Sequence, residues 1–421
     1  MNESSCLKLA VIGAGPVGLA LALHAAEALP GAEITLFDAR PADKDVSADP
    51  RTLALSLGSV QLLQRIGAWN AADAEAILEV HVSQQPPSRP GLLAGRFAEP
   101  ELTIRAIDEA VPMLGAVLSY GGVVAPLQKV WAAAVKKDPK RLMSRVGSPV
   151  SALKNVDGGV EVDGRRGVEV ESKKGVEVDA GIVDRFDLAV VAEGGVFTTV
   201  PGASLVAGAR PALRHDYRQT AWVGRATFAT EAPKGVAFER FTRHGPAALL
   251  PLPGGGAGLV WCVDSADDPV RDLNDDQRVT VLNTVFHPKA PKIAALSPLK
   301  QFPLGLSAER TLTDGRIVRI GNAAQTLHPV AGQGLNLGMR DAFELVRKLA
   351  RSNDVDSVLR RLEWQRAPDR WAMIAATDFL ARSFTWVLPG AGAARGLGIA
   401  ALQALGPVKS MIARQMMFGS R

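Results

Sequence analysis

The sequence predicts an α/β fold: a three-layer domain of parallel strands and helices, an antiparallel β-sheet inserted into it, and a helical C-terminus. Three observations predict this arrangement. A strand–glycine turn–helix–strand pattern opens the chain, strand-like segments without helices follow between about 210 and 305, and residues 346–421 have a helical pattern. With 421 residues, 47% of them hydrophobic, the chain can form a sizeable core in two lobes.

The N-terminal pattern is typical of a Rossmann-like nucleotide-binding unit. Leu7–Gly13 predicts a buried strand, Leu19–Leu29 an apolar helix and Ala32–Asp38 a second strand. The dinucleotide fingerprint has to occur in this order of elements. A glycine-rich turn without a ligand is the alternative, and the flanking strands and the acidic end of the second strand favour the dinucleotide.

Residues of the glycine motif have distinct expected roles. We expect Gly13 to make the tight turn, Gly15 to let the backbone approach a pyrophosphate, and Gly18 to allow close packing of helix on strand. Pro16 lies within the same motif. Asp38 ends the second strand, where it can accept a hydrogen bond from a ribose hydroxyl. The motif therefore predicts a bound dinucleotide.

A second glycine-rich segment lies far along the chain. Arg316–Ile320 predicts a strand, and a helical pattern begins at about Gln333. Gly332, Gly334 and Gly338 let the backbone pass close to a bound group, because a Cβ there would block the approach. A helix start presents unpaired N–H groups and the positive end of the helix dipole. This segment therefore suits an anion, or a group that becomes anionic during turnover.

Two local patterns predict turns and edge strands, and we assign no ligand to either. An eight-residue unit beginning Gly-Val-Glu-Val occurs three times within 159–182, which predicts added strands at the edge of the first lobe. The run 254–258 lies between predicted strands with no helix after it. We interpret it as a hairpin turn and not as a second phosphate loop.

Composition and cysteine usage predict a cytoplasmic protein. The net charge of +5 over 421 residues gives little support for nucleic-acid binding. Cys6 and Cys262 have no metal-ligand spacing and cannot form a disulfide framework, as expected in a reducing compartment. We find no zinc or iron ligand pattern and predict no metal. Met1–Ser5 is too short and too polar for a signal peptide, since the apolar run after it is the first strand.

Residues 382–421 contain no Asp or Glu, but they carry five Arg or Lys residues among many apolar ones. Pro389 and Arg395 interrupt the best apolar run, so none reaches the length that spans a bilayer. A basic, apolar segment of this kind can lie on an anionic membrane surface, here the inner face of the membrane. A packed pair of helices with a solvated basic face is the alternative, and the sequence leaves both hypotheses open.

Together these segments resemble the FAD-dependent aromatic hydroxylases, most closely the UbiH/UbiF/VisC family of ubiquinone-biosynthesis hydroxylases. The similarity runs nearly end to end, through the blocks Asp49–Ser56, Glu239–Leu252, Gln301–Leu304, Asn322–Arg340 and Trp364–Arg370. It implies a FAD-binding Rossmann-like domain, an inserted β-sheet substrate domain and a C-terminal helical region. The expected ranges are 1–205 and 306–345 for FAD binding, 206–305 for the substrate sheet, and 346–421 for the helices.

The resemblance also implies which residues bind FAD. They lie in the two glycine segments or in the blocks beside them, and they are Gly13, Gly15, Pro16, Gly18, Asp38, Arg51, Asn322, Pro329, Gly332, Gly334, Leu335 and Asn336. By resemblance, Asn322 lies on the ribityl chain, Arg51 near the flavin and pyrophosphate, and Pro329 over the ring. Backbone groups at the Gln333 helix start would stabilise charge at the pyrimidine end of the flavin. For Arg51, a surface arginine without a cofactor role is the alternative.

The implied reaction is the hydroxylation of a polyprenylated phenol. In this family NAD(P)H binds transiently and reduces FAD, and the reduced flavin forms a C4a-hydroperoxide with O₂ that the phenol attacks. No side chain can supply this redox chemistry. We assign no catalytic base. His215, Tyr217, His244 and His328 are candidates, and lone histidines are more often structural.

Two departures from the family pattern bear on function. Glu193-Gly194 stands where the family has an Asp-Gly segment followed by Ser and Arg, which leaves the reductant and its binding mode open. Gln325 replaces a His that is common in the family. The alternative hypotheses are a flavin hydroxylase for a small soluble aromatic, and a non-catalytic flavin- or lipid-binding component of the ubiquinone-biosynthesis complex.

Overall fold

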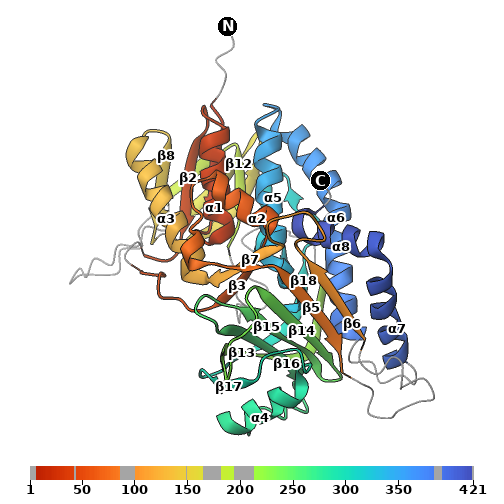
Figure 1. The fold of residues 1–421 in the computed structure, drawn as a ribbon. Helices are drawn as coiled ribbons and strands as arrows, with labels where there is room; N and C mark the ends of the chain where they lie inside the picture. Colours follow the sequence, from red (N-terminus) through yellow and green to blue (C-terminus); the bar gives the residue numbers. More distant parts are fainter. Residues whose placement is uncertain are drawn as a thin grey trace.

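The computed structural model describes residues 6–41, 44–85, 100–147, 149–164, 182–193, 213–383 and 391–419. Figure 1 shows a first lobe of red, orange and light blue elements, a second lobe with green strands below it, and dark blue C-terminal helices along one side. The predicted fold class, an α/β protein with a three-layer domain, a largely antiparallel sheet and a helical C-terminus, is confirmed.

The first lobe is built on a six-stranded sheet. In spatial order its strands are β19 (Thr313–Asp314), β20 (Ile317–Arg319), β12 (Leu188–Val191), β1 (Lys8–Ile12), β2 (Glu33–Asp38) and β8 (Leu142–Val146). All neighbouring strands pair in parallel except β19 with β20. The carboxyl ends of the parallel strands therefore meet at one edge, where α/β sheets bind their ligands.

Helices cover one face of this sheet and a small antiparallel meander covers the other. The helices are α1 (Pro16–Ala28), α2 (Leu57–Arg65), α3 (Tyr120–Lys137) and α5 (Gln333–Leu349). The meander consists of β9 (Val150–Val156), β10 (Gly159–Gly164) and β11 (Ile182–Phe186). Alternation along β1 explains the two faces: Leu9 and Val11 pack on the helices, and Ala10 and Ile12 pack on the meander.

The first repeat unit forms β10, which pairs with β9 and β11. The repeat spans residues 159–182. Of these, residues 165–181 lie outside the described residues. The interpretation of the whole repeat as an edge insertion stays a prediction.

The second lobe is a nine-stranded sheet. Its strands are β21 (Gln325–Thr326), β18 (Lys300–Ala308), β13 (Leu213–Phe228), β16 (Ala257–Asp264), β15 (Gly245–Pro251), β14 (Val236–Thr242), β5 (Glu79–Gln84) and β6 (Glu101–Arg105), with β17 (Ile293–Leu296) paired to β13. Helix α4 (Asp275–Val285) packs on it. The turn at 254–256 joins the antiparallel strands β15 and β16, as predicted for a hairpin. Strands β5 and β6 come from residues 79–105, so the sheet draws on more of the chain than 206–305.

Smaller elements connect the lobes. A three-stranded sheet contains β3 (Thr52–Ser56), β7 (Gly115–Ser119) and β4 (Glu75–Ile77), and the 3₁₀ turns are η1 (Ala71–Asp73), η2 (Gly321–Ala323) and η3 (Val330–Gly332). The domain boundaries proposed from the sequence stay a prediction.

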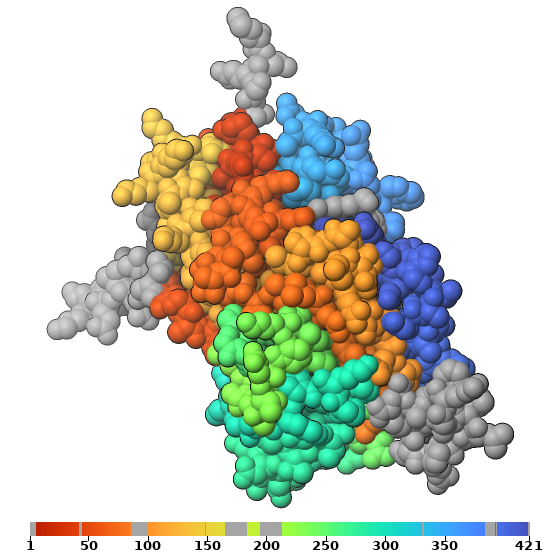
Figure 2. Space-filling view, in the orientation of Figure 1, coloured from red at the N-terminus to blue at the C-terminus, as the bar shows by residue number. Residues whose placement is uncertain are grey.

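The C-terminal region contains α6 (Val355–Ser383), α7 (Ala391–Ala404) and α8 (Gly406–Phe418). Helix α8 buries Ala413 and Met417 against Leu57 and Ile77 of the first lobe. Figure 2 shows the dark blue helices lying along the side of the molecule against orange N-terminal segments. Among the described residues no single helix has the length and apolar character to cross a bilayer, although Ala394–Ala404 and Gly406–Phe418, bent by 94°, meet these criteria as a pair.

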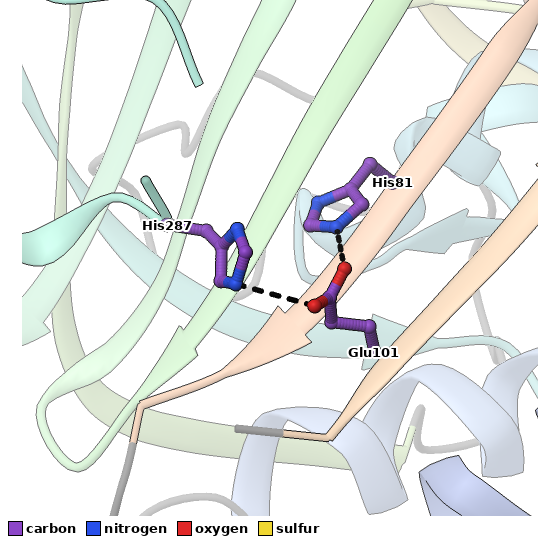
Figure 3. A group of neighbouring side chains, drawn as sticks. All are labelled: His81, Glu101 and His287. Atoms are coloured by element: carbon purple, nitrogen blue, oxygen red, sulfur yellow. Dashed lines mark hydrogen bonds and ion pairs between the residues drawn. The ribbon is translucent and has the colours of Figure 1, made fainter. Parts of the chain in front are cut away.

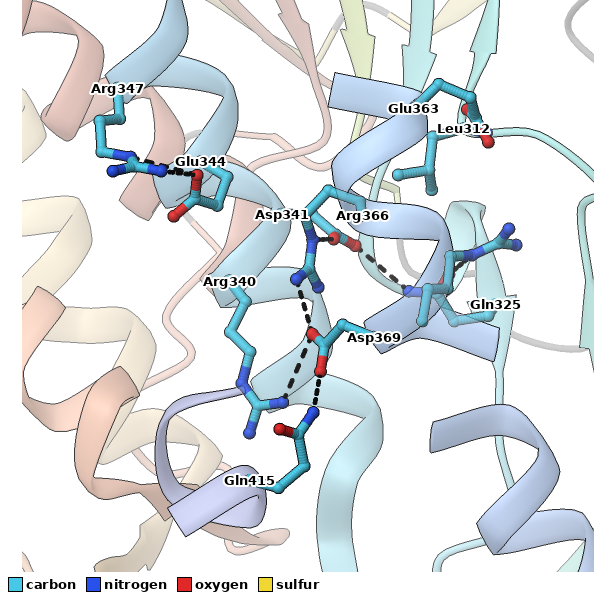
Figure 4. Close-up of polar contacts among 11 residues, drawn as sticks. Leu312, Gln325, Arg340, Asp341, Glu344, Arg347, Glu363, Arg366, Asp369 and Gln415 are labelled. Atoms are coloured by element: carbon cyan, nitrogen blue, oxygen red, sulfur yellow. Dashed lines mark hydrogen bonds and ion pairs between the residues drawn. The ribbon is translucent and has the colours of Figure 1, made fainter. Parts of the chain in front are cut away.

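A buried cluster of charges joins α5, α6 and α8 (Figure 4). Arg366 donates from Nε to Asp341 Oδ1 at 2.7 Å and from a terminal nitrogen to Asp369 Oδ2 at 2.6 Å. Both carboxylate side chains are fully buried. Arg340 donates to the Met416 carbonyl oxygen at 2.6 Å, which ties α8 to α5. The cluster therefore fixes α6 and α8 to α5, the helix that begins within the second glycine segment.

Replacing Arg366 with Met should lower the free energy of unfolding by about 3–5 kcal/mol, because the Asp341 carboxylate would stay buried without its partner. Arg347→Met is the matched control. The Arg347–Glu344 pair on α5 is partly exposed, and its loss should cost under about 1 kcal/mol. Urea unfolding followed by circular dichroism measures both changes. Equal losses would contradict a dominant role for the buried pair.

Candidate functional site

The turn between β1 and α1 is shaped by its glycines. Gly13 has φ +104°, and a Cβ there would lie 2.8 Å from the Glu193 backbone nitrogen. A Cβ on Gly18 would lie 1.9 Å from the Gly13 carbonyl oxygen. These two glycines are thus required by the packing of the chain on itself.

Gly15 differs, because no atom lies within 4 Å of the place where its Cβ would be. Its missing side chain leaves open space at the start of α1. Gly15 is also the N-cap of α1, and no side chain caps the helix there; Pro16 follows as the first helical residue. An open cradle at an uncapped helix start fits the pyrophosphate of a dinucleotide.

Asp38 fixes this turn to the end of β2. Its carboxylate accepts hydrogen bonds from the Ala14 N–H at 2.5 Å and from the Arg40 Nε at 2.9 Å. Burial alone would raise the pKa of Asp38, but the hydrogen bonds from Arg40 and Ala14 hold it below the ordinary value. Arg40 also donates to the Ala14 carbonyl oxygen. The sequence analysis missed Arg40, whose only signal is its place two residues after the acidic strand end.

Glu193 brings a second carboxyl group to the same turn. Burial, together with the negative charge of Asp38, raises its pKa. Its backbone closes over Gly13, so the departure from the family pattern lies directly beside the fingerprint. Gly194, the other half of that departure, lies outside the described residues.

Arg51 is held by neighbours in the first lobe. It pairs with Asp49 at 2.8 Å, and its guanidinium lies over the Tyr120 ring, 4.1 Å from the ring centroid. Its side chain is 56% exposed, so it remains accessible to a ligand. Its role toward a cofactor stays a prediction.

The second glycine segment is locked internally by Asn336. This side chain accepts from the Ser56 N–H and the Ser59 hydroxyl, each at 2.8 Å, and donates to the carbonyl oxygens of Ala54 and Gly332 at 3.1 and 2.9 Å. These hydrogen bonds use the whole side-chain amide and tie the first turn of α5 to β3 and the start of α2. Any contact of Asn336 with FAD would have to use its backbone.

The remaining predicted residues surround this helix start. Gly332 is left-handed with φ +59°, and Gly334 has open space where a Cβ would lie, as Gly15 does. Pro329 and Leu335 are half-buried, and Asn322 is exposed on η2. Their cofactor roles stay predictions, and the open space at Gly334 fits a bound ring or ribityl group.

Helices α1 and α5 bring the two glycine segments together. A Cβ on Gly338 would lie 2.7 Å from the Gly321 Cα and 3.0 Å from a methyl group of Val17. The start of α1 therefore lies beside the second turn of α5, so two uncapped helix starts from distant parts of the chain are neighbours. This donor set, with Arg40 nearby, fits the phosphates and polar groups of FAD.

The four candidate bases occupy two places. His215, Tyr217 and His328 form a row of edge-to-face rings with centroids 5.2 Å apart. His244 lies at the β14–β15 turn, where its Nε2 lies 2.9 Å from Arg243 Nε. Burial raises the pKa of Tyr217 and lowers that of His328 to about 4. No base is assigned from this geometry.

A cleft of about 1100 Å³ lies outside this cradle, between α3 and the β15–β16 turn. Trp69, Lys129, Arg225 and Leu252 are among its lining residues. None of the predicted FAD-binding residues lines it.

His81, Glu101 and His287 form a cluster with metal-ligand chemistry at the second lobe (Figure 3). The two Nε2 atoms lie 2.7 and 3.4 Å from the Glu101 carboxylate oxygens. However, His287 Nδ1 accepts the Lys289 N–H at 3.2 Å, so the ring proton of neutral His287 is on Nε2. A metal needs that Nε2 lone pair, and the Lys289 ammonium already pairs with Glu101. We interpret the cluster as a network of ion pairs.

The chain is similar to several known proteins. The FAD binding domain family matches residues 228–377. Ubiquinone hydroxylase UbiL of Rhodospirillum rubrum is 28% identical over 97% of this chain and 88% of its own length. The 3-demethoxyubiquinol 3-hydroxylase of Escherichia coli is 26% identical over 96% of both chains.

Solved structures share the fold. The p-nitrophenol 4-monooxygenase PnpA of Pseudomonas putida has a TM-score of 0.69 at 15% identity, over 99% of this chain and all of its own. Klebsiella pneumoniae HpxO, solved with FAD and uric acid, has a TM-score of 0.67 at 15% identity, over 99% of this chain and 98% of its own.

The fold is shared with flavoprotein monooxygenases, and the glycine turn of its Rossmann-like first lobe fits a dinucleotide. By these comparisons, the chain is similar to the FAD-dependent aromatic hydroxylases. Its cofactor is FAD, which supplies two-electron redox chemistry and the activation of O₂.

Replacing Gly15 with Ala should weaken FAD binding at least tenfold, because the new methyl group fills the cradle. The stability of the protein without FAD should change by less than about 0.5 kcal/mol, since the methyl group meets no protein atom. Gly31→Ala, in an exposed turn with the same open surroundings, is the control. FAD fluorescence titration and urea unfolding measure the two effects. Wild-type affinity in Gly15→Ala would exclude Gly15 from the site.

Proposed function

We propose that this enzyme hydroxylates a polyprenylated phenol in ubiquinone biosynthesis, with NAD(P)H as a transient reductant. The observation that carries the proposal is the similarity, over nearly the whole chain, to two hydroxylases whose names place them in ubiquinone chemistry. The cradle formed by α1 and α5 supplies the FAD site that such a reaction requires.

The chain's own groups have separable tasks in this reaction. The start of α1 and Arg40 would hold phosphate charge, and Asp38 would keep the fingerprint turn closed through Ala14. The start of α5 would stabilise the negative charge of the reduced ring. The nine-stranded sheet would cover the reacting ring and limit the access of water.

Two other functions remain as alternatives. A hydroxylase for a small soluble aromatic is favoured by the shared fold with the nitrophenol monooxygenase. A non-catalytic flavin- or lipid-binding component of a ubiquinone-biosynthesis complex is motivated by Glu193 beside the fingerprint.

We also propose that α7 and α8 contact the inner face of a membrane. Helix α8 is docked through Ala413 and Met417, as in the packed-helix hypothesis, but the two helices leave other apolar side chains exposed. These are Leu397 on α7, Leu405 between the helices, and Val408 and Met411 on α8, with exposures of 49%, 53%, 36% and 64%. Residues 384–390 and 420–421 of the predicted membrane segment lie outside the described residues.

A loop from the first lobe extends this surface. Glu109 accepts from the Ser410 hydroxyl at 2.6 Å and pairs with Arg414, which holds the loop beside α8. Ile107 in the same loop is 82% exposed. An apolar rim with basic residues near it suits an anionic lipid surface, where a prenylated substrate would also lie.

The purified enzyme should oxidise NADH or NADPH at least tenfold faster when a prenylated phenol is present, and the phenol should gain one oxygen atom. Anaerobic bleaching of the flavin bands and mass spectrometry of the product measure this. A series of phenols with prenyl tails of increasing length separates the polyprenylated-phenol hydroxylase from the hydroxylase for a small aromatic. Affinity should rise with tail length only if the enzyme binds the polyprenyl tail. Flavin that neither nucleotide reduces would favour the non-catalytic role.

The double variant Leu405→Asp/Met411→Asp should lose at least tenfold in binding to anionic vesicles, because two apolar contacts worth about 1.5–3 kcal/mol each when fully buried become charges. Leu213→Asp, at a comparably exposed leucine on β13, is the control and should bind as wild type does. Vesicle co-sedimentation measures the bound fraction. Equal binding by all three proteins would exclude this surface.

A further inference from the structure

His328 is buried immediately before the turn that opens α5. Its side chain is 1% exposed, and both ring nitrogens are engaged. Nδ1 lies 3.2 Å from the backbone nitrogen of Val330, and Nε2 lies 2.8 Å from Gln219 Oε1. A backbone N–H can only donate, so Nδ1 is the acceptor and Nε2 carries the proton. The environment therefore selects one neutral tautomer.

Among the described residues, no charged group next to the ring favours its protonated form. Burial lowers the pKa of His328 to about 4. From β13 it faces Tyr217, whose hydroxyl donates to Asp378 of α6 at 3.0 Å, and Asp378 in turn pairs with Arg382. His215 lies behind Tyr217 in the same row. Near neutral pH the imidazole thus keeps both its donor and its acceptor role.

The His328 ring links the turn before α5 to strand β13. Val330 begins η3, the turn that leads through left-handed Gly332 into α5, and its side chain packs with Phe241 of the sheet. Gln219 belongs to β13, at an irregularity in its pairing with β18 between Asp216 and Gln219.

The backbone of β13 is distorted at this point. Arg218, between the two residues that contact His328, has φ +54°, a value that few non-glycine residues adopt. This distortion coincides with the segment that presents Tyr217 and Gln219 to one ring. Strained backbone persists only where its surroundings enforce it, and such positions cluster at functional sites.

We propose that His328 is a positioning residue that sets the Pro329–Gly332 turn, and with it the amides at the start of α5, in the geometry that binds FAD. It acts through the Val330 N–H, and Gln219 fixes the tautomer that leaves Nδ1 free to accept. The assignment rests on the FAD site but not on the substrate proposed above. A test by FAD binding alone therefore fails or succeeds independently of hydroxylation.

Gln219→Glu tests the tautomer requirement without touching the ring. A carboxylate beside Nε2 raises the pKa of His328, and a protonated imidazole cannot accept from Val330. At pH 8 this variant should bind FAD within about threefold of wild type, and its affinity should fall at least tenfold by pH 6. The wild type should change little over that range. Gln301→Glu, the same change at an exposed position of β18, is the control and should follow the wild type.

Two substitutions of His328 separate its two hydrogen bonds. The amide oxygen of His328→Asn can replace Nδ1, and the amide nitrogen of His328→Gln can replace Nε2. We expect Asn to retain FAD affinity better than Gln by at least fivefold, with flavin absorbance bands closer to wild type. FAD titration and visible spectra at pH 6 and 8 provide the readouts. Flat pH dependence in Gln219→Glu would overturn the proposal, and this test stands even if the His328 variants fail to fold.

Discussion

The close approach of α1 and α5 is the constraint on which the rest of the site depends. Gly18 lies against Gly13, and Gly338 lies against Gly321 and Val17, at distances that no larger residue would allow. Two helix starts from distant parts of the chain are thereby brought close enough to serve one ligand, as we propose for FAD. The positive ends of two helix dipoles, which would repel each other if left empty, are stabilised together when an anionic cofactor binds.

Around this contact, buried polar side chains hold the backbone in place through hydrogen bonds. Asp38 binds the fingerprint turn, Asn336 binds the start of α5 to β3, and His328 binds the preceding turn to β13. Each side chain is buried and has its hydrogen bonds directed at main-chain or neighbouring groups. Such an arrangement lowers the reorganisation required when a ligand arrives, which is a source of both affinity and rate.

Local patterns predicted the fold well where strands and helices are neighbours in sequence. The β1–α1–β2 unit, the β15–β16 hairpin and the helical C-terminus follow from periodicity and turn residues. The place of β5 beside β14 was not predictable in this way, because a parallel pair of distant strands has no turn between them. The resemblance to FAD-dependent aromatic hydroxylases and FAD as the cofactor were inferred from motif blocks, and the comparisons confirm both.

Within the site, sequence reasoning found backbone positions more readily than side-chain roles. Glycines reveal where the chain approaches a ligand or itself, although only the structure separates Gly15 and Gly334, which face open space, from Gly13 and Gly18, which face backbone. The contacts of Arg40 with Asp38 and Ala14 were missed, because a single arginine in a loop is not part of any sequence motif. The role of the Asn336 side chain in binding the start of α5 to β3 was not predicted, because the sequence gives no sign of which distant backbone groups it meets.

The order of strands has a consequence for biosynthesis. In the six-stranded sheet β12 lies between β1 and β20, so β1 shares its sheet with a strand that is synthesised much later, and α5 follows β20. Helix α1 packs on α3 as well as on α5, and its contact with α5 cannot form until about four fifths of these 421 residues have been made. Nascent chains of this length expose unpaired strand edges for many seconds at normal rates of translation. We expect such a polypeptide to depend on chaperones during synthesis, and its cofactor to enter only after the last quarter has folded back onto the first.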